Sequence, residues 1–104
     1  MSKKKFVVRE VFREAVFTRD RNRCRVCGAR DRVLDAHHIT DRHDMPNGGY
    51  VQENGISLCP ECHRKAEDWH ALGIGNRNYH PDELYKLIGS SKERAIEESE
   101  KLEC

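Results

Sequence analysis

Four cysteines of this 104-residue chain form two Cys-x-x-Cys pairs, Cys24/Cys27 and Cys59/Cys62. A two-residue gap lets both thiolates of a pair turn toward one ion, and two pairs complete a tetrahedral zinc site with Zn–S distances of about 2.3 Å. Two disulfides are the alternative use of these residues. Because the start of the chain has no apolar signal-peptide core, we expect the reducing cytoplasm, which favours zinc. The fifth cysteine, Cys104, is expected to be a free thiol.

Histidines form a second group of candidate metal-binding side chains close to these pairs. His37 and His38 are adjacent, and His63 follows Cys62 directly. A neutral imidazole binds divalent metals and, with a pKa of about 6.5, can also accept a proton from water at neutral pH. Side chains alternate along a strand, so His37 and His38 should point to opposite faces and have different roles. The sequence therefore predicts a closed thiolate site and an open imidazole site.

Short helices and strands are expected to position these residues. Apolar residues recur with helical spacing before the first cysteine pair, and prolines favour two later helix starts. An Asn47-Gly48-Gly49 turn signal separates two apolar runs that read as strands. We expect helices at residues 9–19, 61–70, 82–88 and from a serine cap at 90 or 91 to about 102, with strands at 33–39 and 56–58. Glu93 is placed for a capping box in the last helix.

The composition indicates one small domain with little apolar core. Hydrophobic residues make up 37% of the chain and charged residues 36%, so bound zinc would add folding free energy that the core lacks. Residues 1–32 carry 11 Lys and Arg against 4 Asp and Glu, whereas residues 33–91 carry 5 against 9. The basic part suits phosphate contacts, although the lysines at 3–5 would equally form a solvated tail. No apolar run is long enough to span a membrane.

The order and spacing of these motifs resemble the HNH endonuclease family in its zinc-knuckle variant. The resemblance covers residues 9–68 and rests on Leu34-Asp35-Ala36-His37-His38-Ile39, Glu53-Asn54-Gly55-Ile56-Ser57-Leu58-Cys59, Cys62-His63, Arg19-Asp20 and Cys24 to Gly28. It implies an α+β fold with a small ββα-metal (His-Me finger) core and a structural zinc site made by four cysteines. An N-terminal helix and two C-terminal helices would flank this core. We expect a single domain over residues 1–104, with a basic arm at 1–8, the zinc-knuckle and ββα core at 9–70, and C-terminal helices at 81–104.

The resemblance also implies an activity, a metal-dependent DNA endonuclease that hydrolyses phosphodiester bonds. In this interpretation His37 and His63 hold a divalent metal (Mg²⁺, Mn²⁺, Ni²⁺ or Zn²⁺), and His38 is the general base. Asn54 would pin the loop between the strands or orient His38. Expected partners are DNA and a targeting or packaging protein, as in phage or prophage settings.

Two carboxylates are candidate additions to the metal site. Glu67 lies one helical turn after His63, where some HNH enzymes carry a third metal ligand. Asp35 would share a strand face with His37, and it would support a ligand, bind metal itself or remain solvated. His70, a further turn along the helix, is expected to be interfacial.

Two non-enzymatic interpretations compete with the nuclease. A zinc-stabilised nucleic-acid-binding module would use the basic N-terminal part, and a protein-interaction adaptor would use the helices beyond residue 80. A pure binding module needs neither a general base nor an open metal site. The presence of the complete set His37, His38, Asn54 and His63 therefore favours the enzyme.

Overall fold

The structure is a computed structural model that describes residues 2–102, with side chains described from residue 6 onward. The expectations for the side chains of the lysines at 3–5 and for Cys104 fall outside the described residues. None of the helices within residues 2–102 is long and apolar enough to cross a membrane.

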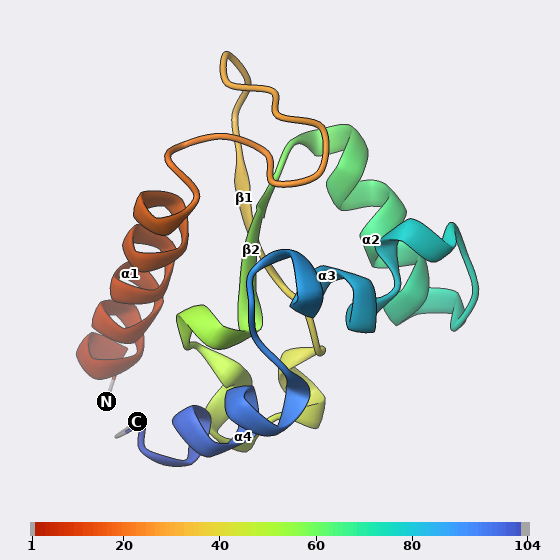
Figure 1. Ribbon diagram of the computed structural model, residues 1–104. Helices are drawn as coiled ribbons and strands as arrows, with labels where there is room; N and C mark the ends of the chain where they lie inside the picture. The colour runs from red at the N-terminus through yellow and green to blue at the C-terminus, as the bar shows by residue number, and fades with distance from the viewer. Residues whose placement is uncertain (1, 103–104) are drawn as a thin grey trace.

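A two-stranded antiparallel sheet lies at the centre of the described chain, with helices on both sides (Figure 1). The helices and strands are α1 (Ser2–Arg19), β1 (Asp35–His38), β2 (Gly55–Leu58), α2 (Pro60–Leu72), α3 (Pro81–Leu87) and α4 (Lys92–Glu100). Helix α1 lies on one side of the sheet and α2 on the other, while α4 packs against the loop that joins the strands. The expected α+β class, with one N-terminal and two C-terminal helices around a ββα unit, is confirmed.

Helix α1 packs tightly against the second strand because residue 55 has no side chain. A Cβ atom at Gly55 would lie 2.5 Å from Val16 Cγ2 and 2.6 Å from Phe12 Cε1. Atoms do not approach this closely, so a larger residue would push α1 away from the sheet. The close packing also brings the Phe12 ring against His38, which is paired with Gly55 across the sheet.

Two boundaries differ from those expected from sequence. Helix α1 begins at Ser2 rather than at residue 9, because neither Gly nor Pro interrupts residues 2–8 and lysine is a good helix former. The first strand covers only Asp35–His38 rather than 33–39. Its partner strand ends at Leu58, opposite Asp35, because the chain then turns into α2. Val33 is consequently 82% exposed.

The start of α4 also differs in detail from the expected capping box. Ser91 is the N-cap, and its side chain accepts a hydrogen bond from the backbone N–H of Arg94. Glu93 therefore stands one position too early in the helix to complete a capping box. The Ser90 hydroxyl instead donates to the backbone carbonyl of Glu53 at 2.9 Å, which links the start of α4 to the loop before β2.

A buried carboxylate joins the end of α1 to the second strand. Asp20 is 1% exposed, and its Oδ2 accepts a hydrogen bond from the backbone N–H of Ser57 at 2.9 Å. The Arg19 guanidinium donates to both oxygens of Asp20 and, at 2.7 Å, to the carbonyl of Gly55. The charge of Asp20 is therefore paired where it is buried, and the pair fixes α1 to β2.

Replacing Asp20 by asparagine should lower the free energy of unfolding by about 3–5 kcal/mol, the usual cost of breaking a buried ion pair. The variant keeps the size of the side chain but leaves the Arg19 guanidinium without its anion. Urea unfolding of the zinc-loaded protein would measure the change. Asp31→Asn, on an exposed residue of the following loop, is the matched control. Equal stability of the two variants would contradict the tethering role of Asp20.

Candidate functional site

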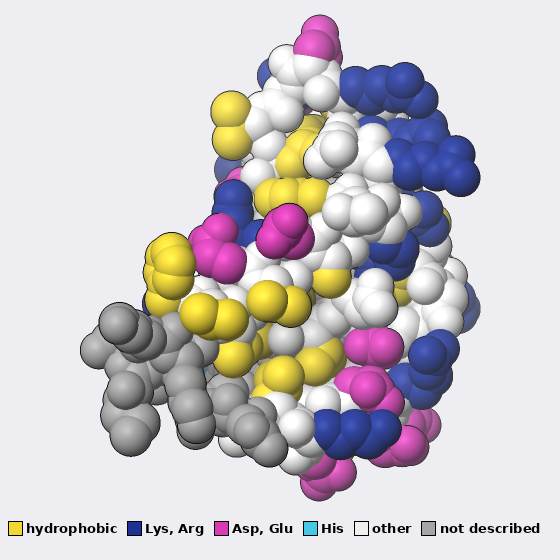
Figure 2. Space-filling view, turned by 90° about the vertical axis from the view of Figure 1, so that its left-hand side faces the viewer, with side chains coloured by type: hydrophobic (Ala, Val, Ile, Leu, Met, Phe, Trp, Pro, Cys, Tyr) yellow, Lys and Arg dark blue, Asp and Glu magenta, His cyan; other side chains and the backbone are white. Residues whose placement is uncertain are grey.

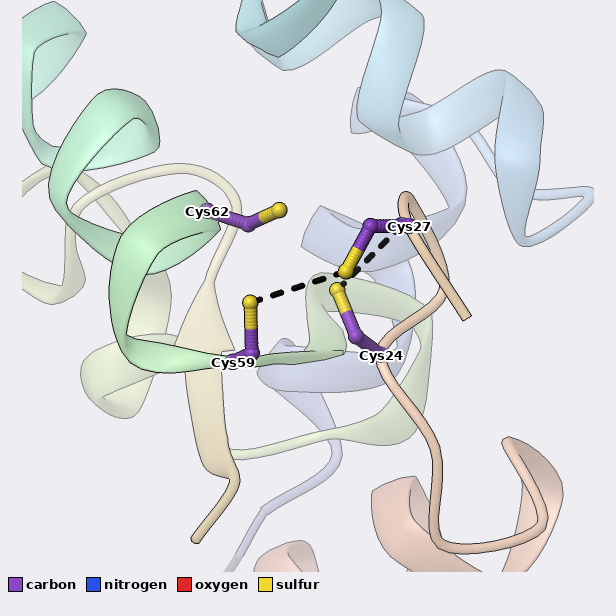
Figure 3. A group of neighbouring side chains, drawn as sticks. All are labelled: Cys24, Cys27, Cys59 and Cys62. Atoms are coloured by element: carbon purple, nitrogen blue, oxygen red, sulfur yellow. Dashed lines mark hydrogen bonds between the residues drawn. The ribbon is translucent and has the colours of Figure 1, made fainter. Parts of the chain in front are cut away.

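The four cysteine thiols converge on one point beside the sheet (Figure 3). Cys24 and Cys27 come from the loop after α1, whereas Cys59 and Cys62 come from the end of β2 and the first turn of α2. All four sulfurs lie within 4.8 Å of one another, and Cys27 Sγ is 3.7 Å from Cys59 Sγ. Sulfurs around one tetrahedral zinc ion are about 3.8 Å apart, given a Zn–S distance of about 2.3 Å. The four thiols form a possible zinc site, and none of them is in a disulfide.

Local backbone geometry creates the first of the two zinc-binding turns. Gly28 adopts a φ of 82° and its N–H donates to the carbonyl of Cys24, which closes the turn after the first pair. Burial would raise the pKa of Cys24, but the backbone N–H groups of Cys27, Cys59 and Val26 lower it to about 7. A thiolate therefore forms readily at neutral pH, which favours metal binding.

Three imidazoles surround one carboxylate oxygen on the other side of the first strand. Glu67 Oε1 lies 3.2 Å from His37 Nδ1, 3.3 Å from His63 Nε2 and 3.7 Å from His70 Nδ1. His37 comes from β1, and the other three residues lie along one face of α2, because residues three and four apart are neighbours on a helix. We call these four residues the Glu67 centre. They border an open cavity of about 290 Å³.

The buried ring of His37 shows that the Glu67 centre is suited to a metal. His37 is 2% exposed; its Nδ1 lies 3.2 Å from Glu67 Oε1 without hydrogen-bond geometry, and its Nε2 has no partner among the described residues. Leaving a buried polar group without a partner costs about 1–3 kcal/mol. Burial lowers the pKa of His37, so its ring is neutral, while the adjacent His37 ring lowers the pKa of Glu67 to about 2. Neutral imidazoles beside an ionised carboxylate are a donor set for divalent transition metals.

Asp35 contacts His63 rather than His37. Its Oδ2 lies 3.3 Å from His63 Nδ1, while the other ring nitrogen of His63 faces Glu67. A carboxylate behind a metal-binding histidine fixes the orientation and tautomer of the ring. Of the three roles expected for Asp35, the contact fits the support of a ligand.

His38 lies on the opposite face of the strand from His37, as the alternation predicts. Its ring stacks on Phe12 with a centroid distance of 4.7 Å and meets the Tyr50 ring edge-on. Burial lowers the pKa of His38 to about 4, and its Nε2 has no hydrogen-bond partner within residues 2–102. Both His37 and His38 nevertheless border the same cavity. His38 is therefore a neutral ring, held by Phe12 and Tyr50, whose buried Nε2 makes no hydrogen bond to the described residues.

Asn54 is fully buried and fastens the loop that follows His38. Its Oδ1 accepts hydrogen bonds from the Thr40 N–H at 3.0 Å and the Tyr85 hydroxyl at 2.7 Å. Its Nδ2 donates to the carbonyls of Thr40 and Gly49 at 3.1 and 3.3 Å. Asn54 also accepts through its own carbonyl from the Ile39 N–H. These contacts correspond to the loop-pinning action expected for Asn54.

Two residues of this site, Tyr85 and His70, are not among the site residues expected from sequence. Tyr85 comes from α3, 31 positions beyond its partner Asn54, and no motif connects the two. His70 is expected to be interfacial, but its ring stacks on His37 with centroids 5.0 Å apart and reaches the Glu67 centre. The spacing of residues 63, 67 and 70 on one helical face was the available signal for His70.

Comparison with protein families assigns the segment that holds both sites. Residues 24–68 match the model of the HNH endonuclease family. This segment, 45 of the 104 residues, is similar to HNH endonucleases. The match spans both cysteine pairs together with His37, His38, Asn54, His63 and Glu67. No curated protein and no solved structure matches the chain.

The match to the HNH model indicates a function on nucleic acid, as a nuclease or as a binding module. The four clustered cysteines fit its zinc-knuckle variant, as expected from the paired motifs. The HNH match ends two residues before His70, so the contact of His70 with the Glu67 centre lies beyond the matched segment.

Proposed function

We propose that this protein is a metal-dependent endonuclease that hydrolyses phosphodiester bonds in DNA. The observation that carries the proposal is the buried, unpartnered His37 ring beside the ionised Glu67, with the neutral His38 ring on the same cavity. A binding module would gain nothing from keeping these nitrogens unpartnered at a cost in stability. A hydrolytic site needs them for a metal and for a general base.

In the proposed mechanism the side chains have separate tasks. His37, His63 and Glu67 would hold a divalent metal, which when bound supplies positive charge beside the scissile phosphate. His38 takes the proton from the attacking water, because its ring is neutral and one nitrogen is unpartnered. Phe12 and Tyr50 fix the plane of the His38 ring by stacking and edge contacts.

The proposed DNA contacts rest on the basic character of the first third of the chain. In Figure 2, Lys and Arg side chains gather near the upper end of the face that α1 presents. Figure 1 places the loop after α1 at this same upper end. Exposed arginines of this loop are Arg21, Arg25, Arg30 and Arg32. Arg42, which borders the cavity of the Glu67 centre, adds positive charge beside the proposed cleavage site. Such side chains bind phosphates without reading sequence.

We further propose that the C-terminal helices belong to the same domain and brace the loop between the strands, with the protein working in the cytoplasm. Asn47 Nδ2 donates to the Ser99 carbonyl at 3.0 Å, and Tyr85 bonds to Asn54 at 2.7 Å. These hydrogen bonds join α3 and α4 to the segment that follows His38. They favour a structural task for these helices over a separate adaptor surface.

A plasmid-cleavage assay tests the nuclease against the binding module. After EDTA treatment that leaves the structural zinc in place, supercoiled plasmid is incubated with Mg²⁺, Mn²⁺, Co²⁺, Ni²⁺ or Zn²⁺. We expect nicked or linear product with at least one metal and none without metal. His38→Ala, purified in parallel, controls for a contaminating nuclease. Plasmid that is shifted in a gel but never cut would instead support the non-catalytic binding module.

A further inference from the structure

His70 is held in one tautomer by a contact on its far side. Its Nε2 lies 2.9 Å from the backbone carbonyl of Ile39. A carbonyl oxygen only accepts hydrogen bonds, so Nε2 must carry the proton of a neutral ring. The lone pair of that ring is then on Nδ1, the nitrogen that faces the Glu67 centre. A histidine whose outer nitrogen is bonded to a backbone carbonyl is oriented as metal-binding histidines are.

Two carboxylate oxygens lie close to His70 Nδ1. Glu67 Oε1 lies 3.7 Å from it and Asp41 Oδ2 lies 3.9 Å from it. A lone pair that faces two carboxylates is repelled by both, so either a hydrogen on Nδ1 or a metal ion must lie among them. The unpartnered ring of His37 stacks on the His70 ring, so two imidazoles present nitrogens to the same centre. The donor atoms of His37, Glu67 and His70 all lie within 4.8 Å of one another.

We propose that His70 Nδ1 is an additional protein ligand of the metal at the Glu67 centre, beside His37 and Glu67, whose donor atoms lie within 4.8 Å of it. This inference rests on the proposed function, because it concerns the same metal. His70 lies outside the segment that matches the family, so the family match does not assign it this role. The support is the geometry of this chain: a fixed tautomer, a largely buried ring and a nitrogen directed at the shared carboxylate.

A further imidazole at this centre would influence which metal it holds. Imidazole-rich sites suit Mn²⁺, Co²⁺ and Ni²⁺ better than Mg²⁺, which prefers oxygen ligands.

Cobalt binding tests the role of His70 without reference to activity. Zinc-loaded protein is titrated with Co²⁺, with calorimetry for affinity and visible absorption for coordination. The wild type should show the visible absorption of Co²⁺ bound at a second site, apart from the cysteines. His70→Ala should bind Co²⁺ about 10–100-fold more weakly and change that spectrum. His43→Ala, an exposed histidine that borders the same cavity, is the matched control and should change neither quantity.

A second variant separates ligation from the structural contact with Ile39. His70→Gln can still donate to the Ile39 carbonyl but lacks the imidazole, so it should lose affinity and alter the spectrum as His70→Ala does. A spectrum and affinity identical to wild type in both variants would overturn the role of His70 while leaving the metal centre intact. Absence of any Co²⁺ binding by the wild type beyond the cysteine site would instead overturn the proposed function.

Discussion

Replacing Cys24 or Cys59 by serine should release the bound zinc and unfold most of the protein. Ligation of structural zinc contributes about 10–16 kcal/mol to folding, which is as large as the whole stability of a typical domain, about 5–15 kcal/mol. Both cysteines are 1% exposed and belong to the main apolar cluster, so their loss also disrupts core packing. A zinc ion held by the four cysteines would tie the loop after α1 to the junction between β2 and α2, and little apolar contact would replace it.

Elemental analysis and far-ultraviolet circular dichroism would measure this effect. The wild type should carry one tightly bound zinc per chain, and each serine variant should lose both the zinc and most of its helical signal. Cys104→Ser, which changes the one cysteine outside the two pairs, should keep both. A zinc-free protein that remains well folded would show that the apolar core is sufficient by itself.

The features that the sequence predicts correctly depend on short-range geometry. A Cys-x-x-Cys turn is a local structure, and two such turns can serve one ion wherever the chain brings them together. The opposite orientation of His37 and His38 follows from the two-residue repeat of any strand. The start of α2 follows from Pro60 at its first position. Each of these depends on residues within one turn or one strand.

The features that the sequence does not predict depend on packing between distant segments. Asp20 bonds to Ser57, 37 positions away, and Asn47 bonds to Ser99, 52 positions away. No local pattern specifies such partners, because they are set by how α1 and α4 lie on the central hairpin. His70 has the correct helical spacing, but its role becomes visible only when the carbonyl of Ile39 fixes its tautomer.

Separate substitutions of His38 and His63 should divide the general base from the metal ligands. His38→Ala should keep the affinity for the divalent metal, because His38 lies across the strand from the Glu67 centre and its ring packs on Phe12. Its cleavage rate should fall by about 10²–10⁴-fold, the usual contribution of a positioned base. His63→Ala should lose both metal affinity and cleavage, since His63 Nε2 is 3.3 Å from the shared oxygen of Glu67.

The pH dependence of the two variants should also differ. Burial lowers the pKa of His38 to about 4, so its ring is neutral and active as a base throughout the neutral and mildly alkaline range. Protonation of His38 therefore does not limit the wild-type rate in this range. In His38→Ala hydroxide must replace the base, so the rate should rise with pH and recover part of the loss. In His63→Ala a higher pH should restore little, because the missing component is the charge beside the phosphate.

Calorimetric metal titration and cleavage rates measured on the same preparations would test this division of roles. The structural zinc must be present in every variant, since its loss would unfold the protein and mimic both effects. His37→Ala completes the set and should behave like His63→Ala, because the His37 ring is buried within the Glu67 centre. If His38→Ala abolished metal binding while His37→Ala spared it, the two adjacent histidines would have exchanged roles. The metal would then have to lie toward the Phe12 side of the strand, with Asp41, a carboxylate that borders the same cavity and interacts with His38, left to balance its charge.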